Sequence, residues 1–305
     1  NEIALKLRKK RFRNGAINFD SEEVGFKLDN EKKPIAVYVK ERGDSNKLIE
    51  EFMLLANKEV ARFIAKKEKG VEKIPFIYRI HDLPNEEKIK ELSYFTKDFG
   101  FSINTKNIAK SFNHLIKESE KNDALKPIIS LAIRTMAKAE YSTENIGHYG
   151  LAFEYYTHFT SPIRRYSDVL AHRILEKNLN GIYRTNETTL ETQCKHISQQ
   201  ERKAMECERE SIKYKQCEFL ENKIGNTYLA IITGMNDKGL FAEIIDNKCE
   251  GMIRFDTMYD NFVLDPSKLK AKGIHSKAQY KIGDKVMIKI LSVDMKQNKI
   301  DFEIE

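Results

Sequence analysis

The chain has 305 residues, 41% of them hydrophobic, which is enough to fill the cores of more than one domain. Lys and Arg outnumber Asp and Glu by 53 to 46, so the formal net charge is +7. This excess favours a polyanionic partner, although a lysine-rich solvated surface gives the same value. The sequence contains neither an apolar run of about 18 residues nor a secretory leader, so we expect no membrane span and a cytoplasmic location.

The four cysteines show no paired Cys-x-x-Cys spacing, which argues against a zinc site and favours reduced thiols. They are Cys194, Cys207, Cys217 and Cys249. The chain opens on Asn1 rather than Met, so we expect it to be a piece of a longer polypeptide.

The first two-thirds of the chain are expected to be rich in helices. Residues 1–43 are predicted to be irregular or β-type, because short apolar alternations such as Val24, Phe26 and Leu28 occur there. Residues 49–64 carry apolar side chains at the spacing of an amphipathic helix. A short strand at 76–80, a helix after Pro84 and two helices within 106–140 follow. A helix beginning near Ser161 and a long charged helix over 189–222 complete this part.

The pattern changes at Gly225 to short alternating segments separated by turns. Five such segments in about 80 residues predict a small closed barrel, interrupted by a polar insertion at 259–276 with a helical turn. The predicted fold class is therefore α+β, with a helix-rich domain over residues 1–224 and a five-stranded barrel over 225–305.

The stretch Thr160-Ser161-Pro162-Ile163-Arg164-Arg165-Tyr166 predicts a helix start with an anion beside it. Ser161 is a favoured N-cap and Pro162 suits the first helical position. Two arginines in the first turn are unfavourable beside the positive end of the helix dipole unless an anion compensates them, and phosphate matches the arginine fork. Asp168, four residues after Arg164, is expected to orient that guanidinium. The alternative is a capped surface helix with solvated arginines.

Several expected core positions follow from the same helix. Ile163, Tyr166, Leu170 and Ile174 are predicted to face the core, while His172 and Arg173 extend the polar face.

Together with His148-Tyr149-Gly150-Leu151-Ala152 and Tyr156-Thr157-His158-Phe159, this stretch resembles the catalytic domain of the ribonuclease II/ribonuclease R (RNB) family. Leu48-Ile49-Glu50-Glu51 with Ala56-Asn57, Arg79-Ile80-His81-Asp82 with Pro84, and Glu144-Asn145 fit the same family in the same order. The resemblance covers nearly the whole chain and is closest to the ribonuclease R type. It implies the C-terminal portion of an RNB catalytic domain followed by an S1-type OB-fold barrel.

The resemblance implies a role for particular residues. Arg164 is expected to contact the scissile phosphate and to stabilise the charge that develops in the transition state. The remaining residues implied to bind RNA, in the 3′-end pocket or along its channel, are His148, Ser161, Arg165, Tyr166, Glu50 or its neighbour Glu51, and Glu208. For each glutamate, a solvated charge on a helix surface is the alternative.

The resemblance implies hydrolysis similar to two-metal phosphodiester cleavage, in which a tight cluster of aspartates holds Mg²⁺. This sequence departs from the family pattern because it contains no such cluster. Asp20, Asp29, Asp44 and Asp82 are scattered, so no metal ligands are expected in this chain and the cluster is expected upstream. The resemblance then implies a Mg²⁺-dependent 3′-to-5′ exoribonuclease that hydrolyses single-stranded RNA to nucleoside monophosphates, with this piece alone inactive. The alternative is a non-catalytic RNA-binding or scaffold protein that kept the fold without the cluster. A monomer is expected, and no helicase or ribosome partner is readable.

In the barrel, Gly239-Leu240-Phe241, Glu250-Gly251-Met252-Ile253 and Ile282-Gly283-Asp284-Lys285-Val286 resemble an S1-type RNA-binding domain. Such barrels stack bases on exposed aromatic rings beside basic side chains. Phe241 and Tyr228 are the expected stacking residues, and Lys238 and Arg254 supply charge. The alternative for Phe241 is a place in the barrel core.

Overall fold

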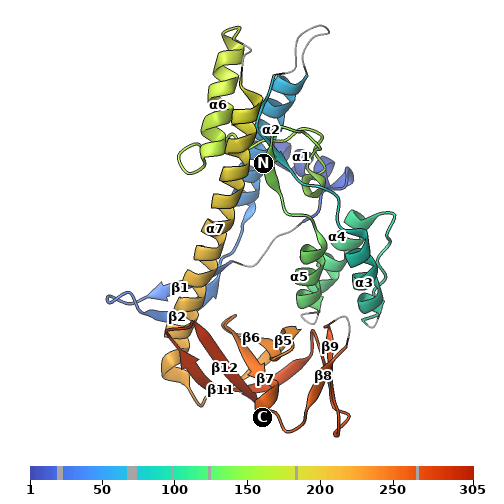
Figure 1. The fold of residues 1–305 in the computed structure, drawn as a ribbon, viewed down its shortest axis with the longest axis vertical. Coiled ribbons are helices and arrows are strands. Elements are labelled where there is room, and N and C mark those ends of the chain that lie inside the picture. The colour runs from blue at the N-terminus through green and yellow to red at the C-terminus, as the bar shows by residue number, and fades with distance from the viewer. Residues whose placement is uncertain (19–22, 67–73, 98, 123–124, 183–184, 266–267) are drawn as a thin grey trace. The chain divides into compact units, whose positions relative to one another are not determined.

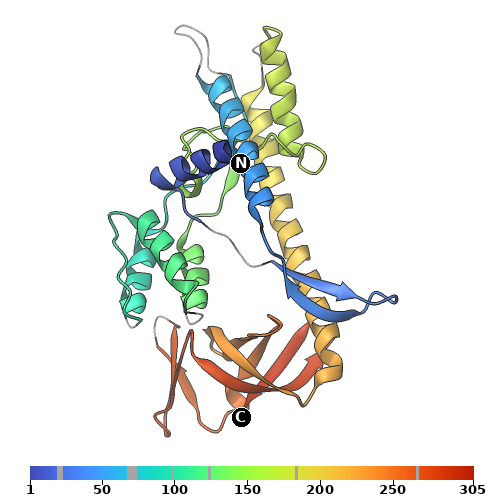
Figure 2. The same cartoon turned by 180° about the vertical axis from the view of Figure 1, so that it is seen from behind.

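The computed structural model describes residues 1–18, 23–66, 74–97, 99–122, 125–182, 185–265 and 268–305. The chain divides into two compact units. The first comprises Asn1–Asn18, Glu41–Glu86 and Thr135–Met205, and the second comprises Phe19–Lys40, Glu87–Arg134 and Glu206–Glu305. Helices and strands occur in both (Figures 1 and 2), so the predicted α+β class is confirmed. A single domain boundary at Gly225 stays a prediction.

The first unit is built mainly from helices around a short two-stranded sheet. Strand β3 (Tyr78–Ile80) pairs antiparallel with β4 (Glu140–Ser142), which sets Arg79 opposite Tyr141. The helices are α1 (Glu2–Arg13), α2 (Asp44–Ala65), α6 (Tyr166–Leu179) and the first part of α7 (Glu187–Leu220), with a short 3-10 turn, η2 (Tyr149–Leu151).

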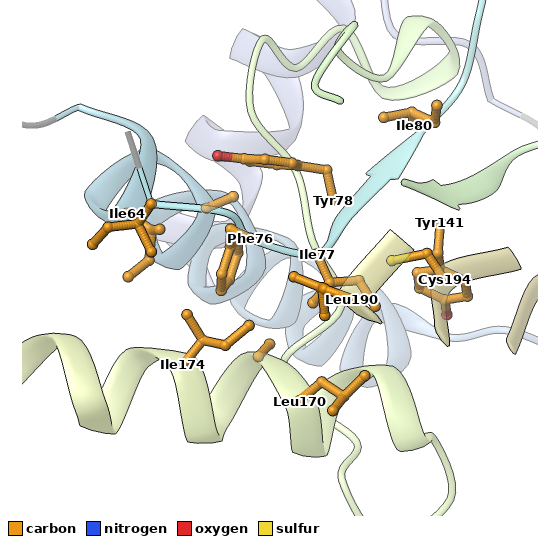
Figure 3. Packing of buried hydrophobic residues seen from close by; sticks show 13 residues of the cluster. Ile64, Phe76, Ile77, Tyr78, Ile80, Tyr141, Leu170, Ile174, Leu190 and Cys194 are labelled. Carbon is orange, nitrogen blue, oxygen red and sulfur yellow. The ribbon is translucent and has the colours of Figure 1, made fainter. Parts of the chain in front are cut away.

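The core of this unit lies where these elements meet (Figure 3). Ile64 of α2, Tyr78 of β3 and Ile174 of α6 pack together, and α7 adds Leu190 and Cys194, which are four residues apart and so lie on one helix face. Each large apolar side chain buried in this way stabilises the unit by about 1.5–3 kcal/mol. The sheet and α6 are thereby fixed relative to one another.

Residues 2–13 form helix α1, so the prediction of irregular or β structure there is wrong. The amphipathic pattern of α1 is weak because the buried face of this helix includes a charged residue. Arg11 is 6% exposed, and its Nη2 donates to Oε1 of Glu51 on α2 at 2.5 Å, while Nη2 lies 3.5 Å from Oε1 of Glu50. An ion pair therefore replaces apolar packing between α1 and α2.

The second unit holds a hairpin, three helices and a barrel. The hairpin consists of β1 (Val24–Leu28) and β2 (Pro34–Val39). The helices are α3 (Glu86–Lys97, which begins at the edge of the first unit), α4 (Ile108–Ser119) and α5 (Lys126–Thr135). The end of α7 contributes the buried residues Gln216, Cys217 and Leu220, and a 3-10 turn, η3 (Glu221–Lys223), leads into the barrel.

Five strands close the predicted barrel in the order β11-β12-β7-β6-β5. They are β5 (Thr227–Asn236), β6 (Gly239–Ile244), β7 (Glu250–Arg254), β11 (Lys285–Asp294) and β12 (Lys299–Ile304). Leu240 and Ile253 are directly opposite on β6 and β7 and are fully buried in the interior. The period of two then places Phe241 and Met252, the next opposed pair, on the outer face.

The insertion differs from the prediction of a helical turn within residues 259–276. It contains β8 (Phe262–Leu264) and β9 (Lys270–Gly273), which form a three-stranded sheet with β10 (Gln279–Lys281), and the 3-10 turn η4 (Phe255–Thr257) precedes it. Two aspartates hold its turns. Asp265 Oδ1 accepts from the backbone of Leu269 and Lys270, and Asp260 accepts from that of His275 and Ser276.

None of the described helices combines the length and the hydropathy needed to cross a bilayer. All four cysteines are free, and only Cys207 among them is exposed.

We predict that Gly239→Ala destabilises the barrel by about 1–3 kcal/mol. A Cβ at this position would overlap the carbonyl group of Ile253 and approach Cα of Arg254 to 3.0 Å, and the backbone of β7 cannot retreat without breaking its ladder. Gly234→Ala is the control, because its Cβ would meet only the Phe241 ring, at an ordinary 3.6 Å. Amide hydrogen exchange in the barrel strands measures the free energy of opening in each of the two variants. Equal effects would contradict the account of the β6–β7 contact.

We also predict that Glu51→Ala destabilises the first unit by about 3–5 kcal/mol, because it leaves Arg11 buried without its main counter-charge. Glu50 is 40% exposed, so Glu50→Ala should cost less than about 1 kcal/mol. Urea unfolding followed by circular dichroism compares the two variants. A larger effect for Glu50→Ala would show that the pair does not hold α1 on α2.

Candidate phosphate-binding site

The turn before α6 is fastened by one buried carboxylate. Asp168 is fully buried, and its Oδ2 accepts from the Ser161 backbone N–H at 2.7 Å and from Nη2 of Arg165 at 2.8 Å. Its Oδ1 accepts from the Ser167 hydroxyl at 3.0 Å. The Ser161 carbonyl in turn accepts from the backbone N–H groups of Arg164 and Arg165 at 3.3 and 3.1 Å. Residues 161–165 therefore form a closed turn rather than helix.

This arrangement corrects three sequence predictions. Helix α6 begins at Tyr166 with Arg165 as its N-cap, so Ser161 is not the cap and Pro162 is not the first helical residue. Asp168 binds Arg165 instead of Arg164. Ile163 is fully exposed and Tyr166 is half-exposed, whereas Leu170 and Ile174 are buried as predicted. The cause is the Asp168 carboxylate, which draws the Ser161 N–H into a turn.

Arg164 projects from this turn into solvent, and no carboxylate pairs with its guanidinium among the described parts of the chain. Its neighbour Arg165 is 18% exposed and held by Asp168. Arg165 is thus fixed by its ion pair, whereas the N–H donors of the Arg164 guanidinium remain available to a ligand. An open guanidinium on a fastened turn can bind an anion with both of its edges.

The segment before the turn is held from α2 and β3. Asn57, which is 3% exposed, accepts from the Phe159 backbone N–H at 3.0 Å and donates to the Tyr156 hydroxyl at 3.2 Å. The Thr157 hydroxyl donates to the Ile77 carbonyl at 2.6 Å. His172 of α6 stacks flat on the Phe159 ring, with centroids 3.8 Å apart, and contacts the Phe159 carbonyl. These contacts fix residues 156–160 on the core.

Two half-buried histidines adjoin the arginines. Burial lowers the pKa of His158 to about 2, and Arg165, Arg79, His148 and Arg164 lower it further. Burial also lowers the pKa of His148 to about 3, with contributions from His81 and Arg79. Both imidazoles are therefore neutral at neutral pH, and the arginines carry the positive charge of the site.

The charges around these histidines do not balance. Arg79 pairs with Glu201 at 2.6 Å and lies over the Tyr141 ring, Arg165 pairs with Asp168, and Arg164 has no such partner in the described ranges. In addition, Arg165 Nε and the Thr160 hydroxyl are buried without a hydrogen-bond partner. An unsatisfied buried donor costs about 1–3 kcal/mol, so a bound oxyanion would stabilise this region.

No group of three or more His, Cys, Asp or Glu side chains that could hold a metal ion occurs within the described residues. The donors of this site are guanidinium and imidazole groups, whereas Mg²⁺ prefers carboxylate oxygens. The described residues of this site therefore do not fit Mg²⁺.

The other residues expected to bind RNA lie in several places. Ser161 and Arg165 belong to the fastened turn, and Tyr166 starts α6. His148 makes a ring contact with Tyr156, which in turn contacts His158. Glu51 is buried in its ion pair with Arg11, a placement that favours a structural role, while Glu50 is partly exposed. Glu208 lies exposed on α7 in the second unit.

The barrel residues divide between two faces. Phe241 is half-buried on the outer face of β6 beside Met252, and Arg254 follows on the same face of β7, paired with Asp256. Tyr228 is opposite the fully buried Ile288 and so faces the interior side. Lys238 is exposed in the β5–β6 turn. Phe241 and Arg254 share a surface that Tyr228 does not.

No role was expected for Tyr141, Arg79, Asn57 or Thr160, although the last three lie within motifs that resemble the family. Arg79, Tyr141 and Asn57 come from separate elements, and no spacing in the sequence connects them to residues 156–165. His158 was recognised only as part of a motif.

Two known domain families match most of this chain. The RNB domain matches residues 1–181, and the S1 RNA binding domain matches residues 221–305. Ribonuclease R of Aquifex aeolicus is 35% identical over 304 residues, which are 98% of this chain and 42% of that protein.

Solved structures show the same relationship. The apo form of Mycoplasma genitalium RNase R matches 99% of this chain with a TM-score of 0.91 and 26% identity, and 48% of that chain is covered. The same protein in complex with ribose-methylated single-stranded RNA matches with a TM-score of 0.88. Yeast Ssd1, described as a pseudonuclease, shares the fold with a TM-score of 0.61 at 20% identity over 83% of this chain and 30% of that one.

The chain thus spans less than half of the length of these relatives. Because the RNB match covers more than half of its residues and an S1 match follows, the chain belongs to the RNB family of ribonuclease R-like proteins.

Proposed function

We propose that this chain is part of a 3′-to-5′ exoribonuclease of the ribonuclease R type, which hydrolyses single-stranded RNA to nucleoside monophosphates. The observation that carries the proposal is the open guanidinium of Arg164 on a turn fastened by Asp168. Membership of the RNB family supports the activity, and the matched relatives named ribonuclease R support the type.

Arg164 binds the nonbridging oxygens of the scissile phosphate and stabilises the charge that grows on them in the transition state. A guanidinium suits this task because its planar fork makes two charge-assisted hydrogen bonds to one phosphate. Arg165 fixes the turn through Asp168 and raises the local positive potential. Since both nearby histidines are neutral, no imidazolium competes with Arg164 for the anion.

Mg²⁺ would supply Lewis-acid chemistry from an aspartate cluster in the longer protein, upstream of Asn1. We propose that this chain does not cleave RNA by itself, because no cluster suited to that ion occurs among its described residues. Its own contribution is to bind and orient the phosphate.

The barrel binds the same RNA strand through the outer face that carries Phe241 and Arg254. A base stacks on the Phe241 ring, which lies next to Gly234 on the neighbouring strand. Arg254 is held bidentately by Asp256, at 2.9 and 2.5 Å, so it contributes charge from a fixed position. Lys238 adds charge at the β5–β6 turn.

A second candidate is a non-catalytic RNA-binding or scaffold protein. It is favoured by one observation, namely that the fold alone is shared with a protein described as a pseudonuclease. An assay with end-labelled single-stranded RNA and Mg²⁺ on the full-length protein separates the two. Stepwise release of mononucleotides supports the enzyme, and binding without release supports the scaffold.

We predict that Arg164→Ala in the full-length protein lowers the cleavage rate by about 10²- to 10³-fold while weakening RNA binding much less, because the contact strengthens in the transition state. Lys177→Ala, which removes an exposed charge from the last turn of α6, is the charge-matched control. Single-turnover cleavage and filter binding give the two quantities. Equal losses of binding and cleavage would make Arg164 an ordinary anchor.

We predict that Phe241→Ala weakens RNA binding by about 1–3 kcal/mol and leaves the rate of the chemical step unchanged, because it removes a stacking surface. Leu229→Ala, on the outer surface of β5, is the control for losing an exposed apolar side chain from the same barrel. Unchanged affinity in the Phe241 variant would remove this ring from the RNA-binding surface.

A further inference from the structure

His158 lies at the centre of the charged groups of the first unit, yet no sequence pattern gave it a role. Its Nδ1 is 2.7 Å from the Tyr141 hydroxyl, and its ring contacts those of Tyr141 and Tyr156 edge-on. No group in the described chain hydrogen-bonds its other nitrogen, Nε2, which is also absent from the buried unsatisfied atoms. Nε2 is therefore not fully enclosed by the described part of the protein.

The surrounding hydroxyls decide which ring nitrogen carries the proton. Ser167 gives its single proton to Asp168 Oδ1, although the Ser167 hydroxyl is also within reach of Tyr141. The Tyr141 phenol can then donate either to the Ser167 oxygen or to His158 Nδ1. An imidazole nitrogen is the stronger acceptor of the two, and its contact is short. With Nδ1 accepting, the proton of the neutral ring lies on Nε2.

The same neutral ring stands in a positive field. Arg164, Arg165 and Arg79 all act on it, and the carboxylates Asp168 and Glu201 are already engaged with Arg165 and Arg79. An added charge on the imidazole would be repelled by three guanidinium groups. A neutral N–H donor avoids that cost and still offers a hydrogen bond to an anion.

We propose that His158 is a further phosphate-binding residue, whose Nε2–H donates to an oxygen of the phosphate held by Arg164. This inference rests on the proposed function, because that function supplies the phosphate. Tyr141 acts as a positioning residue, since it touches only the imidazole and fixes its tautomer.

Two matched variants test the proposal in the full-length protein. His158→Gln places an amide N–H₂ near the former Nε2, whereas His158→Asn keeps a polar group near Nδ1 and has no donor at the outer position. A hydrogen bond to a charged group contributes about 1.5–3 kcal/mol, so we expect His158→Asn to lose about 10- to 100-fold in single-turnover cleavage. His158→Gln should recover most of it. Equal losses in both variants, or none in either, overturn the proposal.

The pH profile distinguishes hydrogen-bond donation by a neutral His158 from proton transfer. The groups that face His158 are Tyr141, Tyr156, His148, Arg79, Arg164 and Arg165. With its pKa near 2, His158 stays neutral above pH 5, so its replacement by Gln should leave the shape of the profile between pH 5.5 and 8 unchanged. Loss of an inflection in this range would assign His158 to proton transfer instead.

The tautomer itself is measurable in the 305-residue chain by ¹H–¹⁵N correlation of the histidine side chains. We expect a neutral ring protonated at Nε2 that changes to a mixture of tautomers in Tyr141→Phe. A ring protonated at Nδ1, or an imidazolium, overturns the proposal whatever the activity.

These experiments separate the two levels of the argument. If the wild-type protein cleaves RNA and the His158→Asn variant cleaves it equally well, the proposal that His158 binds phosphate is wrong and the proposed function stands. If the wild-type protein does not cleave, the proposed function is wrong. The affinities of the two variants for a single-stranded oligoribonucleotide then decide whether His158 contacts phosphate.

Discussion

The site depends on one buried carboxylate. Asp168 accepts a backbone N–H from Ser161, a guanidinium N–H from Arg165 and a hydroxyl from Ser167, so three donors of one short segment converge on its two oxygens. Removing it would leave a buried arginine without its counter-charge and would release the turn. The exposed position of Arg164 follows from this interaction, because the turn, rather than a helix, determines the direction in which residues 163 and 164 project.

Around this carboxylate, positive charge and neutral hydrogen-bonding groups are carried by different side chains. Arg79 and Arg165 are paired with Glu201 and Asp168, and His148 and His158 are kept neutral chiefly by burial. Arg164 then remains as the charge that an incoming anion meets. A preorganised site of this kind needs little rearrangement when negative charge develops on a ligand, which is the property expected of a group that stabilises a phosphoryl transition state. We propose that the cleavage chemistry itself also depends on a metal-binding part upstream of this chain.

The sequence predicted the elements whose apolar periodicity is strong and missed those held together by charge. Helix α2, the α7 helix and the five-stranded barrel follow from spacing and alternation, and they are confirmed. Helix α1 was missed because its buried face carries Arg11 instead of an apolar side chain. The start of α6 was placed four residues early, since the competition of Asp168 for the Ser161 N–H is an effect that no local helix preference reveals. The same limit hid the partnership of Tyr141 with His158, which lie 17 residues apart and meet only through packing on the core.

The most direct measurement is a structure of the full-length protein bound to single-stranded RNA that carries a non-hydrolysable linkage at its 3′ end. The account predicts that the Arg164 guanidinium contacts a backbone phosphate, at about 2.7–2.9 Å, while Asp168 still binds Ser161 and Arg165. It is contradicted if Arg164 forms an ion pair with a protein carboxylate, or points into bulk solvent, while the RNA lies elsewhere.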